Sequence, residues 1–114
     1  MWNIELTDTF QNWYENLDEN QRADVLASIF LLREKGPQLS RPHADTLYNS
    51  SFSNMKELRI QSKGQPLRAF FAFDPNRVGL ILCAGNKVGD EKQFYKKMIP
   101  IAEREYQRHL DNMR

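Results

Sequence analysis

The chain has 114 residues, of which 40% are apolar and 27% are charged. This balance is typical of one folded domain spanning residues 1–114, and it excludes a disordered chain. No apolar run approaches the roughly 20 residues that cross a bilayer, so we expect no membrane partner. The single cysteine, Cys83, and a start without a basic and apolar leader favour a reducing, cytoplasmic setting.

The charges are distributed unevenly along the chain. Residues 1–34 contain seven acids and two bases, a net charge of −5, whereas residues 35–114 have a net charge of +6. Such a chain can present a basic surface to phosphates and another surface to a protein partner. The alternative is an acidic pair of helices packed on a basic sheet, with no functional meaning.

The first third of the chain predicts one strand and two helices. Apolar and polar residues alternate over residues 2–6, which indicates a short strand. A helix with an apolar stripe follows, capped by Thr7 or Asp8. Asp18 caps a second helix, which ends at Gly36 because glycine accepts the left-handed conformation and the proline after it cannot continue the helix.

The rest of the chain predicts a loop, three strands and a helix. Residues 37–54 show no period and are expected to be a loop. The three strands are expected at residues 55–61, 67–73 and 78–84, and the short turns between them imply an antiparallel meander. Asp90 begins a last helix that runs to about residue 109. The prediction is an α+β fold with its helices packed mainly on one face of the sheet.

The strands carry the residues that we select as a candidate site. The two-residue period of the first meander strand puts Glu57 and Arg59 on one face, and Arg68 lies on the next strand. Lys87 follows the last strand, and Tyr95 lies in the first two turns of the last helix. We expect Arg59, Arg68 and Lys87 to converge on one concave basic surface. Alternatively, the two arginines are ordinary solvated residues paired with Glu57.

This set of residues suits RNA cleavage. The 2′-hydroxyl of RNA can attack the adjacent phosphate, and a protein then supplies a proton acceptor, a proton donor and cations for the phosphate oxygens. Arginine fits the last role, Glu57 is a candidate acceptor, and Lys87 or Tyr95 can donate a proton or orient a base. No cofactor and no metal site is expected, because His43 and His109 are far apart in the chain and cysteine pairs are absent.

Two segments, Met55–Arg59 and Leu67–Asp74, resemble the core of RelE/ParE-superfamily toxins, in which a Leu-x-Glu-Leu-Arg-like strand leads into an arginine-containing apolar strand. The loop Arg41–Leu47 and the tail Phe94–Ala102 are similar to the HigB-like, phage-associated branch. The resemblance implies a RelE-like fold and the toxin of a type II toxin–antitoxin system. That toxin is an mRNA interferase, a ribosome-dependent endoribonuclease that inhibits translation.

The resemblance also implies partners and site residues. The partners are an antitoxin, often of helix-turn-helix type, and the ribosome with its mRNA. By position, Arg59, Arg68 and Lys87 match basic residues of the family's site, and Tyr95 matches a base-stacking tyrosine. The lysine-rich catalytic strand of RelE has Met55 and Glu57 at comparable places here, which leaves the proton acceptor open. Further RNA contacts are expected from Lys56, Lys63, Arg41 and His43.

Two other functions fit the same superfamily. A ParE-like toxin would inhibit gyrase and need no RNA-cleaving groups. A non-catalytic RNA-binding domain would keep the fold and lack the reaction. Because the fold is shared, it does not separate these functions from the endoribonuclease. Because no complete acid–base pair is visible in the sequence, we expect cleavage to depend on the ribosome.

Overall fold

The computed structural model describes residues 1–113, which form three α-helices and a five-stranded sheet. The strands are β1 (Ile4–Leu6), β2 (Ala44–Thr46), β3 (Lys56–Ser62), β4 (Gln65–Phe73) and β5 (Gly79–Asn86). The helices are α1 (Asp8–Glu15), α2 (Glu19–Lys35) and α3 (Glu91–Asn112), with a short 3-10 turn, η1, over Gly36–Gln38. The predicted α+β class is confirmed.

The sheet has the order β1-β5-β4-β3-β2. Strands β3, β4 and β5 form the predicted antiparallel meander. The sheet is wider than predicted, because β1 pairs in parallel with β5 and β2 pairs antiparallel with β3. The prediction of a plain loop over residues 37–54 was therefore wrong at β2. A three-residue strand is too short to show a period, and its pairing with β3 gives it an extended conformation.

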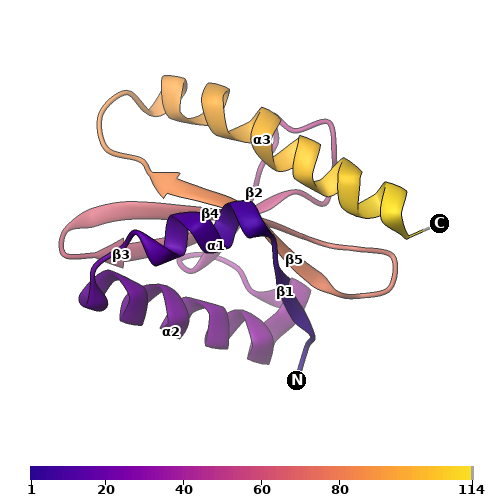
Figure 1. Ribbon diagram of the computed structural model, residues 1–114, viewed down its shortest axis with the longest axis horizontal. Helices are drawn as coiled ribbons and strands as arrows, with labels where there is room; N and C mark the ends of the chain where they lie inside the picture. Colours follow the sequence, from indigo (N-terminus) through magenta and orange to yellow (C-terminus); the bar gives the residue numbers. More distant parts are fainter. Residues whose placement is uncertain (114) are drawn as a thin grey trace.

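Helices cover both faces of the sheet, which corrects the expectation that they pack mainly on one face. Figure 1 shows α1 and α2 on one side of the sheet and α3 on the other. Two separate apolar clusters lie between these layers, one under α1 and α2 and one under α3. The physical reason is the composition of β4 and β5, which are apolar at consecutive positions and therefore need cover on both faces.

A register shift between β4 and β5 determines which residues of β5 face α3. The β4–β5 pairing shifts after Phe70 and leaves Leu82 without a direct partner. Leu82 and Cys83 therefore both face the cluster under α3. The hydroxyl of Thr7 donates to the carbonyl of Leu82 at 2.6 Å and accepts from the amide of Phe10 at 3.0 Å. Thr7 thus caps α1, which decides between the two predicted caps, Thr7 and Asp8, and fixes that helix to the shifted strand.

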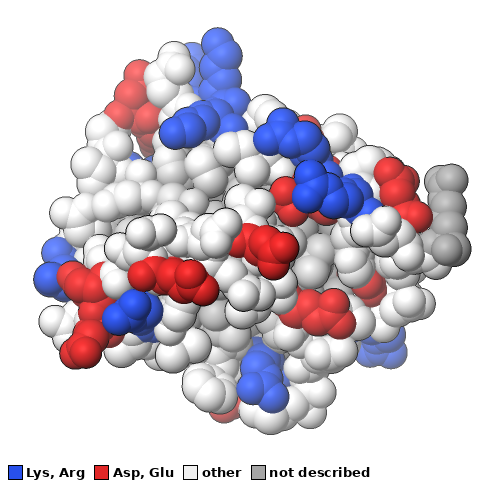
Figure 2. All heavy atoms as spheres, in the orientation of Figure 1, with Lys and Arg blue, Asp and Glu red and all other residues white. Residues whose placement is uncertain are grey.

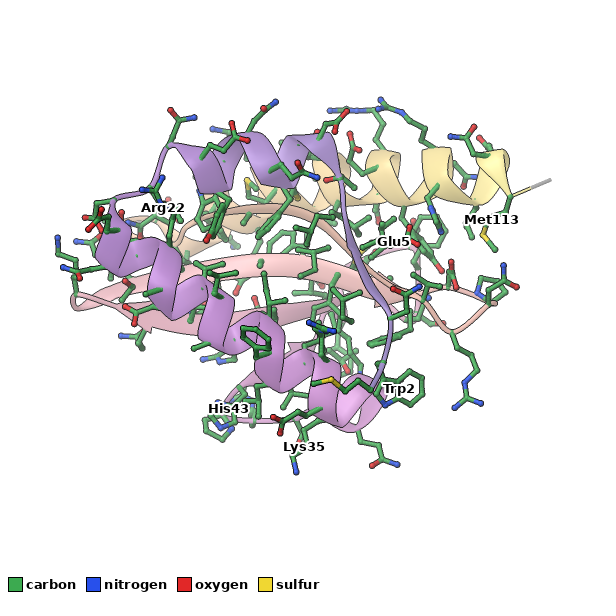
Figure 3. The ribbon with its side chains drawn as sticks, turned by 60° about the horizontal axis from the view of Figure 1, so that its bottom comes forward. Trp2, Glu5, Arg22, Lys35, His43 and Met113 are labelled. Atoms are coloured by element: carbon green, nitrogen blue, oxygen red, sulfur yellow. The ribbon has the colours of Figure 1, made fainter. Side chains whose placement is uncertain are left out.

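The end of α2 lies at Gly36, as predicted, because of both conformation and space. Gly36 has a φ of +62°, and a Cβ atom there would lie 2.3 Å from the Trp2 ring. The amide of Trp2 donates to the carbonyl of Arg33 at 2.9 Å. Figure 3 shows Trp2 beside the end of α2, near Lys35. The glycine therefore lets the N-terminal segment pack against the helix end.

The surface reflects the uneven charge of the sequence. In Figure 2, basic side chains gather along the top of the view, over α3, and acidic side chains lie across the middle, over α1. Among residues 1–113, no helix combines the length and apolar character needed to cross a membrane.

Replacing Gly36 by alanine should destabilise the fold strongly. The left-handed backbone and the collision with Trp2 together predict a loss of about 2–5 kcal/mol in the free energy of unfolding, measured by urea denaturation. Gly64 is the matched control, because its φ is +76° and nothing lies within 4 Å of its Cβ position. Gly64→Ala should lose only about 1 kcal/mol. Equal losses in the two variants would show that the Trp2 contact is unimportant.

A buried carboxylate joins the β4–β5 turn to the end of α3. Asp74 accepts from the amides of Asn76 and Val78, and its Oδ2 lies 2.7 Å from Nε2 of His109. Burial of Asp74 opposes its ionisation, but His109 and the two amides outweigh burial and hold the pKa of Asp74 below its usual value. The ionised form of Asp74 therefore stabilises the folded state.

This contact predicts a pH-dependent contribution to stability. Because the pKa of Asp74 is lower in the folded protein, the contribution is complete above pH ~4 and is lost as the pH falls through the lowered pKa. Asp74→Asn should reduce the free energy of unfolding at pH 7 by about 1–3 kcal/mol, and the deficit should shrink in acid. Urea unfolding across pH tests this, with Asp111→Asn at an exposed position of α3 as control. A deficit that is constant with pH would contradict the assignment.

Candidate functional site

The pairing of β3 with β4 brings the predicted charged residues together. Arg59 lies directly opposite Arg68, two positions along from the pair formed by Glu57 and Phe70. Two like charges in such a pair repel each other unless an acid lies between them. Glu57 fills that role, with Oε2 at 3.1 Å from Nη1 of Arg59 and Oε1 at 3.9 Å from Nε of Arg68. One carboxylate therefore serves two guanidinium groups.

The third partner of this carboxylate comes from α3. The hydroxyl of Tyr95 donates to Oε1 of Glu57 at 2.6 Å. Burial, and then the neighbouring Glu57 carboxylate, raise the pKa of Tyr95 far above its usual value, so the phenol keeps its proton. The Tyr95 ring stacks on Phe70 with centroids 6.0 Å apart, which fixes the direction of the hydroxyl. The face predicted to be open is thus partly covered by α3.

Arg68 is buried, not solvated. Only 5% of the residue is exposed, and its Nη1 donates to the carbonyl of Leu67 at 3.0 Å. Within residues 1–113, its Nε is the one buried side-chain polar atom without a hydrogen-bond partner. The 3.9 Å separation from Glu57 is an ion pair but too long for a hydrogen bond. Arg68 therefore does not fit the alternative of an ordinary solvated strand residue, and it keeps an unused donor.

Lys87 completes the group of residues selected from the sequence. It follows β5, where its amide donates to the carbonyl of Pro66 at 2.8 Å. Its Nζ lies 5.9 Å from the centre of the Tyr95 ring and 3.2 Å from Glu91. The structure thus connects all five residues proposed for the reaction. We call them the arginine–tyrosine cluster: Glu57, Arg59, Arg68, Lys87 and Tyr95.

A depression of about 450 Å³ lies beside this cluster, between β3, β4 and the loop before β2. Arg59, Arg68 and the predicted RNA-binding residue Arg41 line it, together with Pro42 and Gln61. Arg41 is exposed and forms an ion pair with Asp45 at 2.8 Å. The hydrogen bond from Arg41 lowers the pKa of Asp45 and raises that of Arg41, so both remain charged. Three arginines therefore line the depression.

Three other predicted RNA-binding residues lie elsewhere. Lys56 is on the opposite face of β3, where its Nζ donates to the carbonyl of Pro37 at 2.8 Å. Lys63 is in the β3–β4 turn and pairs with Asp18 at 3.0 Å. His43 is exposed at the edge of the molecule in Figure 3, and its backbone carbonyl, not its ring, accepts from the amide of Arg59 at 2.8 Å. The structure does not bring these side chains into the cluster.

Sequence reasoning missed Gln61, which lines the depression. The signal was available, because the same two-residue period that selected Glu57 and Arg59 includes Gln61. In the part of the chain that the structure describes, no three His, Cys, Asp or Glu side chains come together as metal ligands.

Comparisons with known proteins give the family. The sequence profile of the phage-derived Gp49-like family matches residues 12–107. HigB3 of Mycobacterium tuberculosis, described by its name as a toxin, is 42% identical over 93 residues, which cover 82% of this chain and 80% of HigB3. HigB2 of the same organism, also described by name as a toxin, is 42% identical over 99 residues. These cover 86% of this chain but 49% of HigB2, so the chain spans about half of that relative.

Solved structures share the fold at low identity. A mutant of the E. coli toxin RelE in the free state has a TM-score of 0.63 and 10% identity, covering 94% of this chain and 96% of that one. The RelBE2 toxin–antitoxin complex of Mycobacterium tuberculosis contains a chain with a TM-score of 0.57 and 16% identity, covering 75% and 96%. The predicted RelE-like fold is confirmed. The profile match and the HigB relatives show that this chain belongs to the Gp49-like family and is a HigB-like toxin, and its fold is that of RelE.

Proposed function

We propose that this toxin cleaves mRNA on the ribosome and thereby inhibits translation. The observation that carries the proposal is the arginine–tyrosine cluster, in which Arg59 and Arg68 share one carboxylate beside a depression that Arg41 also lines. Three guanidinium groups around an open depression form a site for a phosphate, because each can pair with phosphate oxygens and stays charged. The proposal includes the cytoplasm as location and an antitoxin of helix-turn-helix type as partner.

In the proposed reaction the scissile phosphate occupies the depression. The 2′-oxygen of the preceding ribose attacks phosphorus, and the bond from phosphorus to the 5′-oxygen breaks. The products are a 2′,3′-cyclic phosphate and a 5′-hydroxyl. Arg59 and Arg41 contact the phosphoryl oxygens from the open side, and Arg68, opposite Arg59 on β4, has its unused Nε. Fixed cations of this kind stabilise the extra charge of the transition state.

Two protons move in this reaction, and the cluster has a group for each. Before RNA binds, Oε2 of Glu57 accepts from Arg59 and Oε1 accepts from Tyr95. When Arg59 turns toward the phosphate, Oε2 is released to accept the proton of the 2′-hydroxyl, while Tyr95 holds the other oxygen. Lys87, beside the Tyr95 ring, gives a proton to the departing 5′-oxygen.

The ribosome has the role of holding the strand. The protein lines the depression with β3, β4 and the loop before β2, and Arg41 at its rim is largely exposed. In-line attack requires the 2′-oxygen, phosphorus and 5′-oxygen to be aligned, which a strand free to move reaches rarely. We therefore expect the protein to cut translated mRNA much faster than naked mRNA.

Replacing Arg59 by alanine should reduce cleavage by about 10²–10³-fold, the usual effect of removing one donor that stabilises a transition state. The test is a translating extract with a defined mRNA, in which primer extension maps new 5′ ends. Lys63→Ala is the matched control, because it removes a cation that pairs with Asp18 outside the cluster. Arg68→Ala should also reduce the new ends strongly, and it leaves the buried Glu57 with one partner fewer.

Several results of this assay would contradict the proposal. Equal loss of cleavage in Arg59→Ala and Lys63→Ala would show that the cluster has no specific role in the reaction. Intact mRNA with the wild-type protein would reject the endoribonuclease. A supercoiling assay would then separate the gyrase inhibitor from the non-catalytic RNA-binding domain.

Glu57→Gln should slow cleavage by about 10²–10⁴-fold, because the amide cannot take the proton of the 2′-hydroxyl. Tyr95→Phe should have a smaller effect, about tenfold, because it removes the hydroxyl that holds Glu57 but keeps the ring on Phe70. Single-turnover cleavage on purified ribosomes that carry a defined mRNA measures both rates. If Glu57→Gln cleaves as fast as the wild type, Glu57 is not the proton acceptor.

A further inference from the structure

A second hollow lies on the other side of Tyr95 and has a volume of about 700 Å³. It runs between the first half of α3 and the loop that follows β2. The residues that line it and matter here are Asn49, Lys92, Tyr95, Lys96, Ile99 and Pro100. We call it the α3 groove.

The charges of the α3 groove change along the helix. Lys92 and Lys96 lie one turn apart near the cluster, and within residues 1–113 neither has an acidic partner within 4.0 Å. Ile99 and Pro100 form an apolar stretch in the next turn. The groove therefore offers two available cations followed by an apolar surface.

The two acids that also line the groove are already engaged. Glu91 pairs with Lys87 at 3.2 Å. Glu103 accepts from the hydroxyls of Ser50 and Ser51, each at 2.9 Å, and from the amide of Ser51 at 2.7 Å. Burial opposes ionisation of Glu103, but these hydrogen bonds hold its pKa below the usual value. Glu103 is thus a charged group that anchors the loop and marks the end of the groove away from the cluster.

Tyr95 connects the two sites. Its hydroxyl belongs to the arginine–tyrosine cluster through Glu57, and its side chain also lines the α3 groove. We propose that the α3 groove binds the single-stranded RNA next to the cleaved phosphate. Lys92 and Lys96 contact its phosphates, and Ile99 and Pro100 contact a base. The inference rests on the proposed function and extends it from one phosphate to the strand beside it.

Charge and continuity favour RNA over a protein segment as the occupant. A polyanion gains from both lysines, whose partners are otherwise water. Tyr95 bonds to Glu57 beside the arginines and also lines the groove, so the two sites adjoin and one strand can occupy both. Contacts through phosphates and base faces are typical of single-strand binding without strong sequence preference.

The test is equilibrium binding of a short, fluorescent, fully 2′-O-methylated oligoribonucleotide, which the proposed reaction cannot cleave. Fluorescence anisotropy is measured over a range of salt concentrations. Lys92→Glu with Lys96→Glu should weaken binding at least tenfold. Loss of the two lysine contacts should also reduce, by about 1.4, the steepness with which the logarithm of the binding constant falls with the logarithm of the salt concentration. Each phosphate contact of a single strand contributes about 0.7 to this slope.

The matched control is Lys97→Glu with Arg104→Glu, which makes the same charge change at exposed positions of α3 that do not line the groove. This control should weaken binding less than threefold and keep the wild-type slope. Equal effects in both double variants would show that the positive charge of α3 attracts RNA without a defined site, and this would overturn the inference. No effect in Lys92→Glu with Lys96→Glu, or no binding by the wild type, would overturn it as well.

The outcome is separable from that of the cleavage experiment. If the wild type leaves mRNA intact but its binding of the oligonucleotide depends on Lys92 and Lys96, the proposed reaction fails and the α3 groove stands. If the wild type cleaves mRNA and the two lysines make no difference to binding, the reaction stands and the groove inference fails.

Discussion

The buried carboxylate of Glu57 is the group on which the rest of the site depends. Only 3% of this residue is exposed, and a charge so far from water is tolerated only with close partners. It has three: Arg59 from its own strand, Arg68 from β4 and Tyr95 from α3. Removing a partner from a buried ion pair costs about 3–5 kcal/mol, so β3, β4 and α3 are coupled through this one side chain. Arg68 is held in place on β4 by burial and by its own contacts, whereas Arg59 is the more exposed of the two arginines.

The position of α3, which supplies Tyr95, depends on an irregularity in the middle of the sheet. The extra residue at Leu82 turns Cys83 and, two residues later, Gly85 toward α3. A Cβ atom on Gly85 would lie 3.0 Å from the Phe94 ring, so the absence of a side chain lets the start of α3 approach β5. Burial raises the pKa of the Cys83 thiol to about 12, and this cysteine serves packing rather than chemistry. One additional residue in β5 thus turns toward α3 the glycine at which the helix approaches the strand.

The sequence predicted those parts of the site that follow from local rules. Alternation along a strand is local, and it correctly placed Glu57 and Arg59 on one face. The same rule puts Lys56 on the other face of β3, away from the cluster. The prediction that Lys56 contacts RNA followed from its charge and not from its position on the strand. Long-range packing decides what the sequence did not predict: the face that α3 covers, the pairing of β2, and the contact of Tyr95 with Glu57. These contacts join residues that are far apart in the chain, and Tyr95 and Glu57, for example, are 38 positions apart. No local pattern in the sequence predicts them.

The strand order also determines when a new chain acquires its site. The first strand, β1, pairs with β5, which is synthesised about 75 residues later, and the carboxylate of Glu57 waits for Tyr95 from the last helix. A partly synthesised chain therefore lacks β5 between β1 and β4, and Glu57 lacks its hydrogen bond from Tyr95. The chain has to leave the ribosome as far as Tyr95 before these contacts form. Synthesis from the N-terminus thus delays maturation of the site until β5 and the start of α3 have emerged.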